Sequence, residues 1–407
     1  MLLLEKHLAK FGMQLGLERI EKILAVLGNP EKNLRVILVA GTNGKGSVTA
    51  YLSGILHAAG YKVGSYYSPH LLRYNERFKV NGREISDAKM KKYEQWMLRL
   101  SKNHSLTLFE ALTAIAYKYF SDEHCQFAVM EVGLGGRLDA TNTAKEEIGI
   151  ITSVALDHMR ELGNSLDQIA YEKAGILKNG LGIIGKTDEK SKAKIKSEAE
   201  KRNVKLKIFD NDFQCKPIET NAERTAFNYL GKNSYKNLET KLLGSHQAMN
   251  ASLAVAAAEN LGIGEKEIRQ GLKLASIRAR MEILSKKPLI IVDGAHNPHA
   301  MRQLVENLKL FKYDNLIVLF AALKDKDWKG MIDLIAPKAK MMIITQVRNP
   351  RAENPRAIAA HAARYTNVKV IKNAKTALSL ARSKTEKDDL LLICGSLYLA
   401  GEILNIF

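Results

Sequence analysis

The stretch VILVAGTNGKGS (residues 36–47) decides the fold of this chain. Five apolar residues are followed by a turn with three glycines, and an apolar helical pattern begins near Ser47. A strand, a glycine-rich turn and a helix in this order are typical of a phosphate-binding loop, in which backbone N–H groups and the helix N-terminus face phosphate oxygens. Lys45 can reach terminal phosphates and Ser47 can ligate magnesium, although Gly46 separates them, unlike in the usual Gly-Lys-Ser/Thr loop. The stretch predicts a nucleotide site; a glycine-rich turn without a ligand is the alternative.

Further apolar runs predict a parallel α/β sheet, because helical patterns separate most of them. The runs are FAVMEV (127–132), IGIITSVAL (148–156), LIIV (289–292), LIVLFAAL (316–323), MMIITQV (341–347) and LLLIC (390–394). FKVNGREIS (78–86) predicts a hairpin with an Asn-Gly turn. Residues 209–243 predict an insertion with short strands. We therefore predict a P-loop-type, mostly parallel sheet domain over residues 1–280 and a smaller Rossmann-like α/β domain over 281–407.

Length, composition and net charge restrict the classes of protein to which this chain can belong. The chain has 407 residues, too many for one core of usual size, with 46% hydrophobic and 26% charged residues. Its net charge of +19 favours anionic partners. Nucleic acid is one alternative, but the lysine-rich segment 186–207 has few aromatics to stack bases and is typical of a solvated helix face. Three distant cysteines suit a reducing compartment. We expect a cytoplasmic protein without a signal peptide or membrane span.

Polar side chains follow the predicted strands, where ligands bind in open α/β sheets. Glu131 stands where run 127–132 gives way to the glycine-rich GLGGRLDATN, and a carboxylate facing a phosphate loop suits magnesium. His158 follows run 148–156, although a lone histidine is more often structural. Ser68 precedes a proline, which keeps it out of helical geometry; a plain loop is the alternative.

Helix starts carry further candidates. Phe109 and Glu110 belong to TLFE (107–110), and a capping box alone explains the glutamate. Ser165 and Gln168 form a similar cap ahead of Lys173, which by itself reads as a surface lysine.

Two more motifs suit a nucleotide. Gln247 and Asn250 stand at the start of an alanine-rich helix (249–262), where their amides can read an adenine edge. In DGAHNP (293–298), Asp293 can bond a ribose hydroxyl and His296 can touch a phosphate; a turn with an Asx cap is the alternative.

Together these motifs resemble the Mur ligase superfamily, and within it the folylpolyglutamate synthase/dihydrofolate synthase family. The resemblance runs from QLGLERI (14–20) to CGSLYLAG (394–401). It rests on GTNGKGS, SPHLLRYNERF, EVGLGGRLDATN, ALDH, EKAGI, HQxxN and DGAHNP. It implies that ATP phosphorylates a pteroate or folate carboxylate and that the amine of L-glutamate attacks the acyl phosphate.

The resemblance also implies roles for individual residues. Catalytic residues are Lys45, Lys173 and His296, with Lys173 carrying a carbamate. ATP contacts are Asn43, Gly44, Lys45, Gly46, Ser47, Gln247, Asn250, Arg280 and Asp293. Ligands of Mg²⁺ are Ser68, Glu131 and His158. Contacts to dihydropteroate and folates are Gly16, Leu17, Phe109, Glu110, Arg137, Leu138, Asp139 and Ala140.

One departure and several alternatives stay open. The family usually has Pro-Gly-Arg between the domains, whereas this chain has Arg278-Ala279-Arg280, so Arg278 is a substitute candidate for the ATP contact. The resemblance favours a monomer acting on dihydropteroate and then on folates. A folate-only synthase is the nearest alternative. A P-loop nucleotide switch would need a guanine-reading Asn-Lys-x-Asp motif, which is not found in this sequence. A basic nucleic-acid binder would leave Glu131, His158 and DGAHNP without a role.

Overall fold

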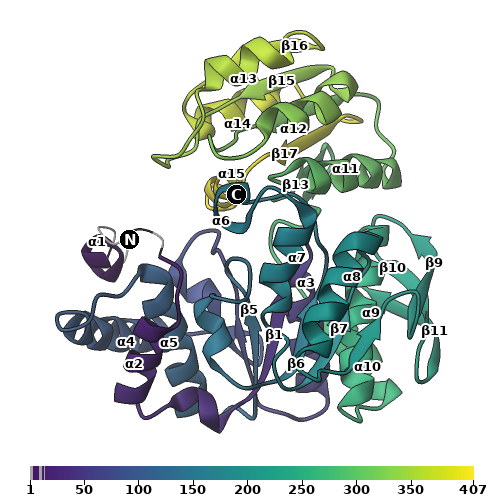
Figure 1. Ribbon diagram of the computed structural model, residues 1–407. Coiled ribbons are helices and arrows are strands. Elements are labelled where there is room, and N and C mark those ends of the chain that lie inside the picture. The colour runs from purple at the N-terminus through teal and green to yellow at the C-terminus, as the bar shows by residue number, and fades with distance from the viewer. Residues whose placement is uncertain (1–2, 9–11, 13) are drawn as a thin grey trace. The chain divides into compact units, whose positions relative to one another are not determined.

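The computed structural model describes residues 3–8, 12 and 14–407, and it divides them into two compact units (Figure 1). The first unit contains everything described up to Glu219, together with Thr225–Lys241 and Gln247–Ser276. The second contains Thr220–Arg224, Leu242–His246 and Ile277–Phe407. Among the described residues, no helix is long and apolar enough to cross a membrane.

An eight-stranded sheet forms the centre of the first unit, in the order β4-β3-β2-β5-β1-β6-β7-β8. Its strands are β1 (Arg35–Ala40), β2 (Val63–Tyr66), β3 (Phe78–Val80), β4 (Arg83–Glu84), β5 (Phe127–Glu131), β6 (Glu146–Ile151), β7 (Leu181–Ile184) and β8 (Leu206–Ile208). The pairs β2–β3 and β3–β4 are antiparallel, and the other pairs are parallel. The run 36–40 is fully buried in β1, between β5 and β6, because helices cover both faces of a parallel sheet.

The helices of this unit are α1 (Leu3–Leu8), α2 (Glu18–Val26), α3 (Lys45–Ala58), α4 (Asp87–Leu100), α5 (Leu108–Asp122), α6 (Met159–Leu162), α7 (Leu166–Ala174), α8 (Glu189–Glu200) and α10 (Glu265–Leu274), while α9 (Ser245–Asn260) begins in a segment of the second unit. A three-stranded sheet of β9 (Gln214–Thr220), β10 (Thr225–Leu230) and β11 (Ser234–Thr240) confirms strands in the insertion. The Asn81-Gly82 hairpin turn is also confirmed, with φ of 49° and 76°.

The second unit is built on a six-stranded sheet in the order β12-β13-β17-β14-β15-β16. Its strands are β12 (Glu282–Lys286), β13 (Leu289–Val292), β14 (Leu316–Phe320), β15 (Met341–Ile344), β16 (Asn367–Val370) and β17 (Leu390–Cys394). Its helices are α11 (Pro298–Asn307), α12 (Trp328–Ile335), α13 (Pro355–Ala362), α14 (Ala374–Ser383) and α15 (Leu397–Leu404). Only the β12–β13 pair is antiparallel, so both sheets confirm the predicted fold class.

Two expected elements have different bounds. The apolar run 148–156 ends as a strand at Ile151, because the next four residues leave the sheet and bond the glycine-rich loop. Helix α9 begins at Ser245, four residues before the alanine-rich segment that was expected to start it at Met249.

The helix that follows the glycine-rich loop packs against α10 through two glycines. A Cβ on Gly271 would lie 2.2 Å from Ile55 Cα, and one on Gly54 would lie 2.6 Å from Gly271 O. We predict that Gly271→Ala lowers the free energy of unfolding by about 1–3 kcal/mol, because the overlap with backbone exceeds the ~1 kcal/mol gain in helix propensity. Urea or thermal unfolding measures this.

Gly264→Ala is the matched control. Only the mobile Glu267 carboxylate lies near its added Cβ, at 2.8 Å, so a loss under about 1 kcal/mol is expected. Equal effects of the two substitutions would contradict close helix packing at Gly271.

Candidate active site

The loop between β1 and α3 needs glycine at two positions. Gly44 caps the helix with φ of 86°, and a Cβ there would lie 2.5 Å from Asn250 Oδ1. Gly41 has φ of 146°, and a Cβ there would lie 1.9 Å from Thr152 Oγ1. Lys45 Nζ donates to Gly41 O at 2.9 Å, which holds the ammonium group over the loop. The structure thus confirms the glycine-rich turn between strand and helix, while phosphate binding by this loop stays a prediction.

The segment after β6 holds this loop in place. Thr42 N donates to Ser153 O at 2.9 Å, and Asn43 N donates to Ser153 Oγ at 3.1 Å. Thr152 Oγ1 donates to Asn43 O at 2.6 Å, and the Thr42 hydroxyl bonds both the N–H and the carbonyl of Ala155. These bonds fix the loop backbone from the neighbouring strand end, in addition to the Lys45 bond within the loop.

The two amides of α9 lie behind the loop. Gln247 Oε1 accepts from Tyr51 OH at 3.3 Å and from Asn250 Nδ2 at 3.2 Å, and both amide side chains are buried. Thr240 Oγ1 donates to Tyr51 OH at 3.0 Å. The structure therefore places Asn250 against Gly44 and Gln247 against Asn250, while their role in binding ATP stays a prediction.

Two of the three predicted metal ligands lie together. Glu131 is the last residue of β5, is 6% exposed and pairs in register with Val39 of β1. Ser68 N donates to Glu131 Oε2 at 3.2 Å. His158 lies beyond β6 with φ of 50°, and its N–H donates to Asp157 Oδ1 at 2.9 Å.

The Glu131 carboxylate is compatible with a magnesium ion. Among the described residues, no group of three or more His, Cys, Asp or Glu side chains is placed to hold a metal. Magnesium needs no such cage, because it is commonly bound through one or two carboxylates plus water and substrate phosphates. The buried carboxylate of Glu131 beside β1 supplies a ligand of this kind.

Lys173 is buried, contrary to the expectation for a lysine of an amphipathic helix. It lies in the last turn of α7 and is 3% exposed. Burial, reinforced by the positive charge of Lys45, lowers the pKa of the Lys173 amine to about 7, while the Asp157 carboxylate opposes this shift. A substantial fraction of the amine is therefore neutral at neutral pH, in reach of the charge of the phosphate loop.

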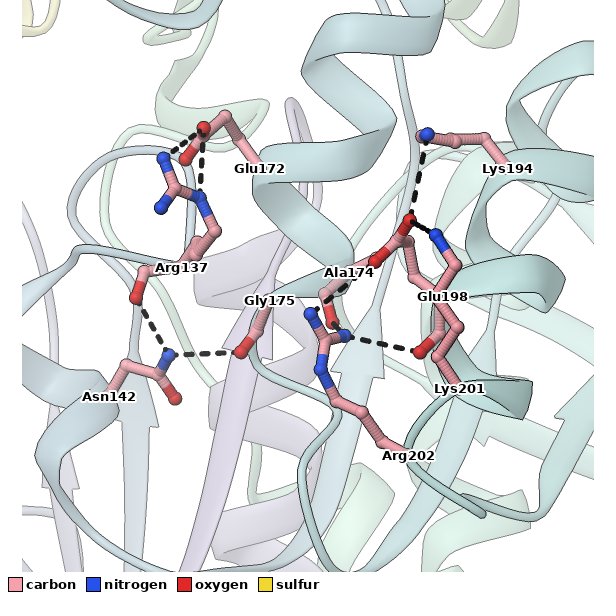
Figure 2. A network of polar contacts seen from close by, with 9 residues as sticks. All are labelled: Arg137, Asn142, Glu172, Ala174, Gly175, Lys194, Glu198, Lys201 and Arg202. Atoms are coloured by element: carbon pink, nitrogen blue, oxygen red, sulfur yellow. Dashed lines mark hydrogen bonds and ion pairs between the residues drawn. The ribbon is translucent and has the colours of Figure 1, made fainter.

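The glycine-rich loop after β5 is tied to α7 (Figure 2). Arg137 Nε and Nη2 donate to Glu172 Oε1 at 3.1 and 2.9 Å. Asp139 is buried and shapes the loop itself, because Oδ2 accepts from Leu134 N and Oδ1 accepts from the Thr141 N–H and hydroxyl. Burial raises the pKa of Asp139, and these hydrogen bonds oppose that shift.

Glu110 also has structural partners. The predicted capping box is present, since Glu110 Oε2 accepts from Thr107 N at 2.7 Å, and Arg19 forms an ion pair with Glu110 at 2.8 Å. Phe109 packs on Gly133, where a Cβ would lie 2.3 Å from its ring. The structure thus brings α5 against both α2 and the glycine-rich loop.

The other predicted folate contacts border these elements. Gly16, with φ of 138°, and Leu17 precede α2, which carries Arg19. Leu138 is half-buried, and Ala140 is buried at the start of the 3₁₀ turn Ala140–Thr143.

The second unit holds the remaining nucleotide candidates. Asp293 is buried, and its Oδ1 and Oδ2 accept from Ala295 N at 2.7 Å and Met281 N at 2.9 Å. Burial raises the pKa of Asp293, and the nearby Arg280 opposes that shift. His296 Nδ1 lies 2.9 Å from the carbonyl oxygen of the glycine two residues before it.

The Arg278-Ala279-Arg280 segment keeps a glycine-like backbone. Ala279 has φ of 55°, and its carbonyl accepts from Gly294 N at 2.9 Å. Arg278 Nε donates to Glu282 Oε1 at 2.6 Å, so this substitute candidate already has an anionic partner.

Sequence reasoning missed several supporting residues. Tyr51, Asn142 and Arg202 gave no local signal, because their partners are distant in the chain. Thr152 and Ser153 did give one, since two hydroxyl residues inside the apolar run 148–156 are unusual for a fully buried strand.

Two family models match this chain. Residues 39–258 match the Mur ligase middle domain, and residues 279–397 match the Mur ligase glutamate ligase domain. The chain therefore belongs to the Mur ligase family.

Similar proteins and solved structures show to which family within the Mur ligases the chain belongs. The chain is 34% identical to the dihydrofolate synthase/folylpolyglutamate synthase of Bacillus subtilis (strain 168), over 97% of this chain and 95% of the relative. It is 31% identical to the folylpolyglutamate synthase of Lacticaseibacillus casei, over 98% and 95%. The structure of E. coli FolC in complex with DHPP and ADP matches with a TM-score of 0.90 and 31% identity, over 99% and 95%. Within the Mur ligases, the chain belongs to the dihydrofolate synthase/folylpolyglutamate synthase family.

The alanine in the Arg-Ala-Arg segment supports a stability prediction. Left-handed geometry costs a non-glycine residue about 1–2 kcal/mol, whereas glycine costs about 0.4–1 kcal/mol more in unfolded-chain entropy. We expect Ala279→Gly to leave the free energy of unfolding unchanged or to raise it by up to about 1 kcal/mol. Urea unfolding measures this.

Ala256→Gly, in the interior of α9, is the control and should lower that free energy by about 1 kcal/mol. If Ala279→Gly is as destabilising as the control, the backbone of this segment is not left-handed in solution.

Proposed function

We propose that this protein ligates L-glutamate to dihydropteroate and to the γ-carboxylate of folates, with ATP and through an acyl phosphate. Its family makes it an ATP-dependent acid–amino-acid ligase. The observation that carries the proposal is a buried lysine with a depressed pKa, Lys173, within the field of the phosphate-loop lysine, Lys45.

Phosphoryl transfer explains the arrangement of the first unit. A carboxylate is a poor electrophile until one of its oxygens becomes part of a leaving group, and transferring the γ-phosphate achieves this. The step needs positioning and neutralisation of charge more than covalent help. In this proposal the loop N–H groups and Lys45 hold the phosphates, while Gln247 and Asn250 hold the adenine.

Magnesium is the proposed metal. Ser68, Glu131 and His158 would hold it, with Ser47 close by, and it would neutralise developing phosphate charge. A solved bifunctional relative with Mn, AMPPNP and L-glutamate bound matches this chain with a TM-score of 0.88 and 30% identity, over 98% of this chain and 96% of the relative, which supports a divalent metal of this type.

Lys173 is proposed to carry a carbamate. Its neutral amine nitrogen attacks the carbon of carbon dioxide, an N–C bond forms, and one proton leaves to solvent. Only the neutral amine can react, so the lowered pKa supports this role. The resulting anion beside Lys45 would be favoured by the same positive charge that disfavours a protonated lysine.

The remaining roles follow from the same proposal. Arg137 and the residues around Phe109 would bind the pterin and benzoate, while Arg280, Asp293 and His296 would contact ATP. Residues 1–280 would bind ATP and folate, and residues 281–407 would form the glutamate-ligase domain. We further propose a cytoplasmic monomer with no nucleic-acid partner.

A folate-only synthase remains the second candidate. The L. casei relative bears the name folylpolyglutamate synthase alone, and its identity to this chain is close to that of the B. subtilis relative, at 31% against 34%.

Phosphate release from MgATP with L-glutamate tests the proposal, with dihydropteroate and tetrahydrofolate as alternative acceptors. We expect release with both. Release with tetrahydrofolate alone would establish the folate-only candidate. Release with neither, in a folded protein that binds ADP, would overturn the proposed acceptor class.

Replacing Lys173 tests the carbamate. We predict that Lys173→Ala and Lys173→Arg each lower kcat by about 10²-fold or more, because neither side chain can form a carbamate. Lys190→Ala, which removes an exposed lysine, should leave kcat unchanged. An active Lys173→Arg protein would contradict the role.

Because the pKa of Lys173 is lowered, the rate of carbamate formation should depend on pH near neutrality. Protein depleted of carbon dioxide should regain activity at a rate that rises with pH through about 7, because deprotonation of Lys173 precedes carbamate formation. The time course is followed after bicarbonate is added with the dissolved carbon dioxide held constant. A midpoint near that of an ordinary lysine would contradict a neutral amine at this position.

A further inference from the structure

The loop that carries Arg137 and the last turn of the helix that carries Lys173 are in direct backbone contact. A Cβ on Gly175 would lie 2.3 Å from Arg137 Cβ and 2.4 Å from Arg137 Cα. A Cβ on Gly136 would lie 2.9 Å from Glu172 O and 3.1 Å from Lys173 O. Because no side chain fits at either glycine, the two segments approach as closely as their main chains allow.

One amide group joins the two segments (Figure 2). Asn142 Nδ2 donates to Arg137 O at 3.1 Å and to Gly175 O at 3.0 Å, and Asn142 is 3% exposed. Both partners are carbonyl oxygens, so only the NH₂ end of the side chain can face them.

The amide oxygen of the Asn142 side chain makes no comparable bonds in the part of the chain that the structure describes. Asn142 Oδ1 is buried and has no hydrogen-bond partner among the described residues. A buried acceptor without a partner destabilises a fold. The two bonds from Nδ2 are therefore the contribution that this asparagine makes to the turn.

Other bonds complete the same turn. Arg137 N donates to Glu172 O at 2.8 Å, alongside the ion pair between their side chains. Arg202 Nη1 donates to Ala174 O at 3.3 Å from the opposite side, beside its ion pair with Glu198 (Figure 2). The carbonyls that end α7 are thus bonded from two directions, and the Asn142 side chain bonds both the loop and the turn.

We propose that Asn142 is a positioning residue that holds Arg137 and Lys173 in one fixed relation. This inference rests on the proposed function, in which Arg137 contacts the pterin or benzoate and Lys173 carries the carbamate. Loss of the bridge would let the acceptor-binding loop shift relative to Lys173. The acceptor carboxylate would then no longer meet the γ-phosphate in the required geometry, whereas the nucleotide contacts on α3 and α9 would be unaffected.

The test is the Asn142→Ala protein, checked for folding by circular dichroism. We expect kcat with tetrahydrofolate to fall by about tenfold or more and the acceptor KM to rise, with the Kd for ADP unchanged within twofold. Hydrogen exchange in a peptide spanning residues 171–177 should be faster than in the wild type, which reports the turn without relying on activity. Asn260→Ala removes one part-buried amide bond to a helix carbonyl elsewhere and should change neither the kinetic constants nor the exchange rate.

The Asn142→Asp substitution tests hydrogen-bond donation by this side chain separately from its volume. Aspartate has almost the same shape, but its carboxylate would face two carbonyl oxygens, so kcat should fall at least as far as with alanine. If Asn142→Asp keeps wild-type kcat and exchange, the bridge has no positioning role. If the alanine protein does not fold, Asn142→Ser, which retains one donor, gives the same comparison.

The two proposals fail in different ways. A wild-type protein without ligase activity overturns the proposed function, and the exchange rates still report the bridge. An active wild type with an unchanged Asn142→Ala protein overturns the bridge alone.

Discussion

The hydrogen bonds between the phosphate loop and the segment after β6 are the constraint on which the first unit depends. Glycines give the loop its left-handed turn, and Thr152 and Ser153, which follow β6, hold the loop backbone through hydrogen bonds to Asn43. This sets β1 beside β6, and β5 on the other side brings the Glu131 carboxylate level with Val39. Strand order therefore brings the phosphate loop and the Glu131 carboxylate to the same end of the sheet once the loop is fixed.

The positive charge of the buried Lys173 amine lowers the free energy of unfolding. The Lys173 amine has a pKa near 7 in the folded chain and the ordinary value of about 10.4 when unfolded. Between these values the unfolded chain binds more protons, so this group makes folding stability rise with pH from about 7 to about 10. At neutral pH, burying Lys173 near Lys45 costs stability, and a carbamate would reverse this by replacing a cation with an anion.

Most of the fold could be predicted because buried strands are continuous apolar runs, as VILVA (36–40) is. Run 148–156 was overextended, since apolarity cannot show where a strand leaves its sheet to bond a loop. The helix pattern around Lys173 by itself predicts a surface lysine, whereas the carbamate role implied by the resemblance requires a lowered pKa, and the lysine is buried. A cap and an amphipathic pattern predict the helix but not the contacts of its last turn. Those contacts come from distant residues: Arg137 bonds Glu172, 35 positions later, and Arg202 bonds Ala174, 28 positions earlier.

The acidic residues within the motifs are of two kinds, which the sequence does not distinguish. Asp139, Asp293 and Glu110 each accept from a backbone N–H group of their own turn or helix start, and these bonds shape the loops that carry the neighbouring residues. Glu131 stands at a strand end beside the phosphate loop, where a carboxylate can meet a metal ion. Sequence spacing marks all four as parts of motifs, whereas the structure shows that Glu131 differs in lying at a strand end, where it accepts from Ser68 N. Replacing one of the first three would therefore disturb binding through the shape of the loop, even where the carboxylate itself never touches a ligand.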